Sequence, residues 1–83
     1  MKVQIRYFAS LRETLGMSGE ILETTSEDVA ALRAELMAKG DAYAQALSSG
    51  RAVRVAVNQV MASGDIRLSD HCEVGFFPPV TGG

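Results

Sequence analysis

The sequence is poor in the residues from which most metal and redox sites are built. Its 83 residues include one histidine and one cysteine, His71 and Cys72, which are neighbours in the chain. Adjacent residues of a strand point to opposite faces, so these two cannot share one metal ion. A single cysteine also excludes an internal disulfide and suits a reducing compartment. We therefore expect neither a metal centre nor a disulfide framework.

Positive charge is also scarce and scattered. Eight Lys and Arg residues stand against ten Asp and Glu residues, which gives a net charge of −2. Nucleic-acid binding requires clustered basic side chains that neutralise phosphates. No apolar run approaches the length of about 20 residues that crosses a bilayer, and residues 1–6 alternate like a strand instead of forming a signal peptide. We expect a cytoplasmic protein that binds neither nucleic acid nor membrane.

The residues needed for catalysis are also missing. A nucleophilic Cys72 would need a base beside it, but His71 is expected to point to the other face of the strand. The eight glycines form no phosphate-binding loop between a strand and a helix. We interpret Cys72 as a small buried core residue. The alternative, a free-standing enzyme that uses Cys72, is disfavoured, and we expect the chain not to be an enzyme on its own.

The spacing of apolar residues predicts an α+β fold. Alternation and helical periodicity predict strands over residues 2–8, 20–24, 51–57, 60–62 and 72–77, and helices over residues 9–15, 26–38 and 41–47. Asn58 and Gln59 are expected to form a tight turn. With one main helix and several strands, the first and last strands can lie side by side and parallel. The result is a mixed sheet packed against that helix, as in the ubiquitin-like β-grasp.

The main helix is the best defined element. Thr25 or Ser26 is expected to cap its N-terminus. Its core-facing stripe contains four apolar residues: Val29, Leu32, Leu36 and Met37. Ile66 and Leu68 are expected to form a satellite of the core.

The segment after the last strand, residues 78–83, has an unusual composition. Pro78 and Pro79 stop the strand and stiffen the exit, so that six residues can reach roughly 20 Å into another protein. Gly82 and Gly83 lack Cβ atoms, can pass a narrow channel and leave the terminal carboxylate open. A carboxylate needs activation, for example as an acyl-adenylate, before sulfur or an amine attacks it. The alternative is an ordinary frayed chain end.

Two phenylalanines are expected at the base of this tail. Alternation places Phe8 and Phe77 on the outward faces of the first and last strands. If these strands are neighbours, the two rings lie together and can anchor a partner. Met61 is a candidate extension of the patch. The alternative is an ordinary surface or a second face covered by a helix.

The chain resembles the MoaD family, the small subunit of molybdopterin synthase. Residues 73–83 (EVGFFPPVTGG) are similar to the family's C-terminal signature, residues 7–13 (YFASLRE) to its segment after the first strand, and residues 57–59 (VNQ) to its central hairpin. The resemblance covers the whole chain, and the tail is its most specific part. It implies a β-grasp domain over residues 1–77 and an extended tail over residues 78–83.

The resemblance also implies a two-step cycle. A MoeB-like adenylating enzyme would use ATP and magnesium to activate Gly83, and sulfur transfer would then make a thiocarboxylate. The tail would enter a MoaE-like large subunit and donate sulfur to cyclic pyranopterin monophosphate. Two small subunits would flank a large-subunit dimer in a heterotetramer. The acid–base residues would belong to the large subunit, and no cofactor would be bound by this chain.

The resemblance assigns roles residue by residue. The tail positions are Thr81, Gly82 and the acyl site Gly83, and the partner interface comprises Phe8, Met61, Phe77, Pro78, Pro79 and Val80. A terminal Gly-Gly alone does not separate the molybdopterin type from ThiS-type thiamin carriers, Urm-type tRNA thiolation carriers or protein modifiers. Relatives commonly have a Gly-Asp turn where this chain has His71-Cys72. We therefore expect a different turn geometry and unusual accessibility of Cys72.

Overall fold

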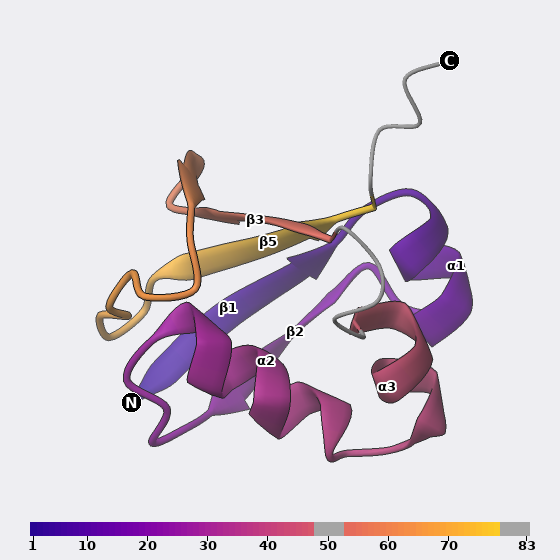
Figure 1. The fold of residues 1–83 in the computed structure, drawn as a ribbon, viewed down its shortest axis with the longest axis horizontal. Helices are drawn as coiled ribbons and strands as arrows, with labels where there is room; N and C mark the ends of the chain where they lie inside the picture. Colours follow the sequence, from indigo (N-terminus) through magenta and orange to yellow (C-terminus); the bar gives the residue numbers. More distant parts are fainter. Residues whose placement is uncertain (48–52, 79–83) are drawn as a thin grey trace.

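The computed structural model describes residues 1–47 and 53–78, and Figure 1 shows its arrangement. The elements follow in the order β1 (Lys2–Tyr7), α1 (Ser10–Leu15), β2 (Gly19–Glu23), α2 (Val29–Met37), α3 (Asp41–Leu47), β3 (Arg54–Val57), β4 (Val60–Ala62) and β5 (Glu73–Phe77). The strands form one sheet in the order β2-β1-β5-β3-β4. β1 and β5 are parallel and central, while the other pairs are antiparallel. The predicted α+β architecture is confirmed.

The core lies between the sheet and the helices, which Figure 1 shows on one side of the sheet. In β1, the alternate residues Val3, Ile5 and Tyr7 are buried, and the residues between them are exposed. β5 contributes Val74 and Phe76 to the same core. The helices contribute Leu11, Val29, Leu32, Leu36, Ala46 and Leu47. No helix among the described residues is long and apolar enough to cross a membrane.

The start of α2 differs from the prediction. Its N-cap is Asp28, whose side chain accepts a hydrogen bond of 2.8 Å from the backbone N–H of Ala31. The expectation that Thr25 or Ser26 caps this helix is therefore wrong. The hydroxyl of Ser26, which precedes the helix, instead donates to Oε1 of Glu35 in α2 at 2.8 Å. The side chain of Ser26, which the local sequence offers as a helix cap, is therefore engaged in a contact with Glu35.

Other element boundaries shift by one to three residues. β1 ends at Tyr7, one residue before the predicted end, and β5 begins at Glu73 instead of Cys72. β3 begins at Arg54, while positions 51 and 52 of the predicted strand lie outside the described residues. Leu68 packs against the core as expected, but Ile66 is 42% exposed, so its predicted core position is wrong.

The hairpin between β3 and β4 confirms the predicted tight turn. Asn58 and Gln59 both have positive φ angles, 50° and 70°, as a two-residue type I′ turn requires. The backbone N–H of Asn58 donates to the carbonyl of Glu73 at 2.8 Å, and the Asn58 side chain accepts from the N–H of Glu73 at 2.9 Å. These two bonds fix the hairpin to the start of β5.

Candidate partner-binding site at the base of the tail

The parallel pairing of β1 and β5 brings two aromatic residues together. Tyr7 is paired with Phe76 in the register, and the next residues along the two strands are Phe8 and Phe77. Their rings stack with centroids 4.5 Å apart and planes inclined by 4°. Both side chains are half-buried. The predicted juxtaposition of Phe8 and Phe77 is confirmed, and their role in partner binding stays a prediction.

A strained turn follows Phe8 directly. Ala9 has φ 51° and ψ −126°, and the N–H of Leu11 donates to the carbonyl of Phe8 at 3.1 Å. This is a type II′ turn, whose first central position favours glycine. An alanine in this region costs on the order of 1–3 kcal/mol. The turn ends β1 and takes the chain directly into α1. Nothing in the sequence identifies it, because alanine is not a turn signal.

The floor of the site is made by small residues. Gly75 is paired with Arg6 on one side and with Ala56 on the other. A Cβ atom on Gly75 would lie 3.1 Å from Phe8 Cε2 and 3.4 Å from Phe77 Cε2, so the absence of a side chain lets both rings lie close to the sheet. The resulting hollow of about 390 Å³ is lined by Arg6, Phe8, Ala56, Gln59, Glu73, Gly75 and Phe77. It has an apolar floor and a polar rim.

The polar rim contains an ion pair that the sequence did not suggest. Arg6 Nη1 lies 3.7 Å from Glu73 Oε2, and the Arg6 guanidinium carbon lies 5.7 Å from the centroid of the Phe8 ring. The first contact joins β1 to β5, and the second joins the charged rim to the aromatic pair. Alternation along β1 and β5 places both side chains on the outer face, but only the register of the two strands brings them together.

Met61 is exposed on the neighbouring hairpin but does not line this hollow. It is directly opposite Ala56 in the β3–β4 register and is 57% exposed. It lines a second groove of about 620 Å³ between α2 and the β3–β4 hairpin, together with residues that include Val29, Ala34 and Val53. The structure therefore brings Phe8 and Phe77 together and leaves Met61 at the far side of Ala56.

Pro78 is the last residue of the tail that the structure describes, and it is half-buried. The remaining predicted tail and interface positions, Pro79, Val80, Thr81, Gly82 and Gly83, lie outside the described residues. Their assignments, and the domain boundary at residue 77, stay predictions.

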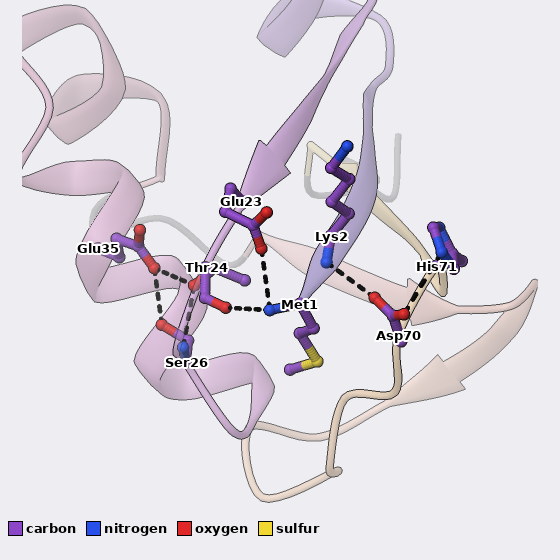
Figure 2. Close-up of polar contacts among 8 residues, drawn as sticks. All are labelled: Met1, Lys2, Glu23, Thr24, Ser26, Glu35, Asp70 and His71. Carbon is purple, nitrogen blue, oxygen red and sulfur yellow. Dashed lines mark hydrogen bonds and ion pairs between the residues drawn. The ribbon is translucent and has the colours of Figure 1, made fainter.

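The turn before β5 corrects the expectation for Cys72. Cys72 is only 3% exposed and belongs to the core, so its predicted accessibility is wrong and its interpretation as a core residue is confirmed. His71 has a φ of +64°, and its N–H donates to the carbonyl of Lys2 at 2.6 Å. Figure 2 shows Asp70 beside it, accepting from the backbone N–H of Lys2 at 2.9 Å and lying 3.3 Å from His71 Nε2. These contacts anchor the turn to β1.

The same end of β1 carries a second polar network, away from the tail. Figure 2 shows the Met1 amino group donating to the carbonyl of Thr24 at 3.0 Å and pairing with Glu23 at 2.9 Å. The hydroxyls of Thr24 and Ser26 converge on Glu35. This network joins β1, β2 and α2. Among the described residues, no group of three or more His, Cys, Asp or Glu side chains could hold a metal ion.

Behind the aromatic site, Glu20 receives three hydrogen bonds. The Tyr7 and Tyr43 hydroxyls donate at 2.9 and 2.8 Å, and Lys39 Nζ donates at 2.9 Å. Burial raises the pKa of Glu20, but the hydrogen bonds from Lys39 and the two tyrosines outweigh it, so the pKa lies below its ordinary value of 4.5. Burial, and then the bond to Glu20, raises the pKa of the Tyr7 phenol. The Glu20 cluster joins β1, β2 and α3.

Residues 5–83 of the chain match the ThiS family. A molybdopterin synthase sulfur carrier subunit of Escherichia coli (strain K12) is 41% identical over 81 residues, which cover 98% of this chain and 99% of that protein. A subunit of the same name from Haemophilus influenzae is 37% identical over the same shares. This chain belongs to the ThiS family, and its MoaD resemblance is confirmed.

Solved structures show the same fold. The small archaeal modifier protein 1 from Methanosarcina acetivorans superposes with a TM-score of 0.80 at 25% identity, over 99% of this chain and 96% of that one. A chain in the complex of subunits 1 and 2 of the molybdopterin-converting factor from Helicobacter pylori also matches. Its TM-score is 0.70 at 23% identity, over the full length of this chain and of that one. The ubiquitin-like β-grasp fold predicted for this MoaD relative is confirmed.

Proposed function

We propose that this protein is the sulfur carrier subunit of molybdopterin synthase, with Gly83 as the carrying residue. The observation that supports this most is the stacked Phe8–Phe77 pair at the end of β5, directly before Pro78. An apolar pair at this position supports a docking site at the base of the predicted tail, whose last two residues are Gly82 and Gly83. The identity of 41% and 37% to two sulfur carrier subunits, over 98% of this chain, supports the choice of pathway.

The chemistry follows from the poor reactivity of a carboxylate. A MoeB-like enzyme would join the Gly83 carboxylate to AMP, using ATP with magnesium and releasing pyrophosphate. A sulfur donor would then displace AMP and leave a thiocarboxylate. In the large subunit this group would transfer its sulfur to cyclic pyranopterin monophosphate, and water would cleave the C–S bond so that the carrier returns as a carboxylate. Gly83 is thus a tethered substrate, and the catalytic side chains belong to the partners.

The docking step rests on the outer face of the sheet. An apolar pair in a hollow with a polar rim is the pattern of an interface anchor. We propose that a MoaE-like large subunit covers Phe8 and Phe77, with two carriers on a large-subunit dimer. Met61, Pro78, Pro79 and Val80 would extend this interface. The buried, reduced Cys72 is compatible with a cytoplasmic location, which we also propose.

The test is the incubation of the full chain with a MoeB-like enzyme, Mg-ATP and a sulfur donor. Mass spectrometry should show a gain equal to the exchange of one oxygen for sulfur, located in the C-terminal peptide. The control is the variant that lacks Gly83 alone, which should not gain this mass. Sulfur transfer that survives the deletion of Gly83 would contradict the proposal.

A second candidate is a carrier of another pathway or a protein modifier. The observation that favours it is the likeness to the small archaeal modifier protein 1. Co-purification separates the two candidates. A MoaE-like partner bound to this chain supports the molybdopterin pathway, whereas isopeptide linkage of Gly83 to lysines of other proteins supports a modifier.

A further inference from the structure

Four side chains form a continuous line of contacts across the outer face of the sheet. Glu73 pairs with Arg6 at 3.7 Å, the Arg6 guanidinium lies over the Phe8 ring at 5.7 Å, and Phe8 stacks on Phe77 at 4.5 Å. The line begins on β5, crosses to β1 and returns to the last residue of β5. It borders the hollow described above and ends where the tail begins.

The Phe8 ring is therefore contacted by both Phe77 and Arg6. A cation over an aromatic face is attracted by the negative charge of the π system. A guanidinium suits this place because its planar group can lie over a ring and still donate to a carboxylate. The carboxylate of Glu73 limits the conformations of Arg6, and Arg6 in turn limits those of Phe8.

We infer that Arg6 is a positioning residue for partner docking: held by Glu73, it fixes the Phe8 ring against Phe77 before the partner arrives. This inference rests on the proposed function, because it needs a partner that covers the aromatic pair. Side chains that are already ordered lose less conformational freedom on binding, so affinity rises without any new contact. Arg6 acts through Phe8 and not through the reacting group.

An exposed ion pair of this length contributes little to folding stability. The substitution Arg6→Met, which keeps an unbranched side chain and removes its charge, should therefore leave the thermal midpoint nearly unchanged. What it should change is the order of the Phe8 ring. Stability and ring order can thus be separated in one variant.

The first measurement needs no partner. Gly75 lies beneath both rings, with a Cβ position 3.1 Å from Phe8 Cε2, so its α-protons report the stack through ring-current shifts in solution NMR. In Arg6→Met these shifts should move toward random-coil values, and Arg6→Lys should restore part of them. The control is Arg67→Met, an exposed arginine whose backbone pairs with Asp28 at the start of α2. Gly75 shifts that are the same in Arg6→Met and wild type would overturn the inference.

The second measurement is a double-mutant cycle on binding to the purified large subunit, by calorimetry. Arg6→Met should weaken binding about two- to fivefold in the wild-type background and hardly at all in the Phe8→Leu background. Glu73→Gln should act in the same direction as Arg6→Met. An equal loss in both backgrounds would mean that Arg6 touches the partner directly, and no loss in either would remove its role; both results overturn the inference.

The two proposals fail in different ways. If the wild-type chain does not bind the large subunit, the proposed function is contradicted, and the Gly75 shifts still decide whether Arg6 orders the ring. If the wild-type chain binds and the Phe8→Leu background shows the full effect of Arg6→Met, only the positioning role is lost.

Discussion

Two aromatic pairs lie on the two faces of the same pair of strands. Tyr7 and Phe76 face the helices, are 1% and 0% exposed, and have ring centroids 6.1 Å apart with planes inclined by 19°. The next residues, Phe8 and Phe77, face the other way and stack more closely, at 4.5 Å and 4°. The alternation of side chains along a strand assigns consecutive residues to opposite faces. One register of β1 against β5 therefore builds both pairs.

The difference between the pairs separates folding from docking. The inner pair belongs to the buried core, so its apolar area is already removed from water. The outer pair lies in an open hollow, and its apolar area remains available to a partner. A change to an inner ring should act on stability, and a change to an outer ring should act on binding.

The largest effect is expected for Phe76→Ala. Truncation of a fully buried phenylalanine leaves a cavity, and should lower the free energy of unfolding by about 3–5 kcal/mol. Urea denaturation followed by circular dichroism measures this loss. Phe76→Leu, which keeps most of the volume, is the matched control and should lose clearly less. A loss below about 1 kcal/mol for Phe76→Ala would show that the inner pair contributes little to the free energy of unfolding.

Phe77→Ala should show the reverse profile. Its unfolding free energy should fall by less than about 1 kcal/mol, because the ring is half-buried, while binding to the large subunit should weaken by about 2 kcal/mol, roughly thirtyfold. Calorimetric titration and urea denaturation of the same preparation give both numbers. Normal binding together with a large stability loss would make Phe77 a core residue and would remove the distinction between the two faces.

The sequence alone predicted that the two outer rings lie together. Alternation in residues 2–8 and 72–77, together with parallel neighbouring strands, predicted that Phe8 and Phe77 meet on the outer face. The Asn58-Gln59 turn was likewise readable, because asparagine tolerates positive φ. Signals of this kind are local, or depend on a strand period that needs no long-range information.

The failures were contacts between distant parts of the chain. Ser26 looks like a helix cap, but Glu35 engages its hydroxyl and Asp28 takes the cap instead. The pairing of Arg6 with Glu73 depends on the register of two strands that are far apart in the chain. Ala9 adopts a strained turn conformation that its residue type does not suggest.

The smallest effect concerns Glu20, the polar support of the inner pair, whose counterpart beside the outer pair is Arg6 with Glu73. Tyr7 donates to Glu20, and the pKa of Glu20 is lowered below 4.5 in the folded state. Because folding lowers this pKa, the stabilisation is present above about pH 4.5 and is lost as the pH falls below the folded-state value. Glu20→Gln replaces charged hydrogen bonds by neutral ones and should cost about 1 kcal/mol at pH 7.

The difference between wild type and Glu20→Gln should therefore shrink when urea denaturation is repeated at progressively lower pH. Glu13→Gln, at an exposed position of α1, is the control and should follow the wild type at every pH. A Glu20→Gln deficit that is the same at pH 7 and well below pH 4.5 would show that the charge of Glu20 does not stabilise the inner face. The hydrogen bond from Tyr7 would then stabilise the fold equally well with a neutral acceptor, and the two aromatic pairs would differ only in their burial.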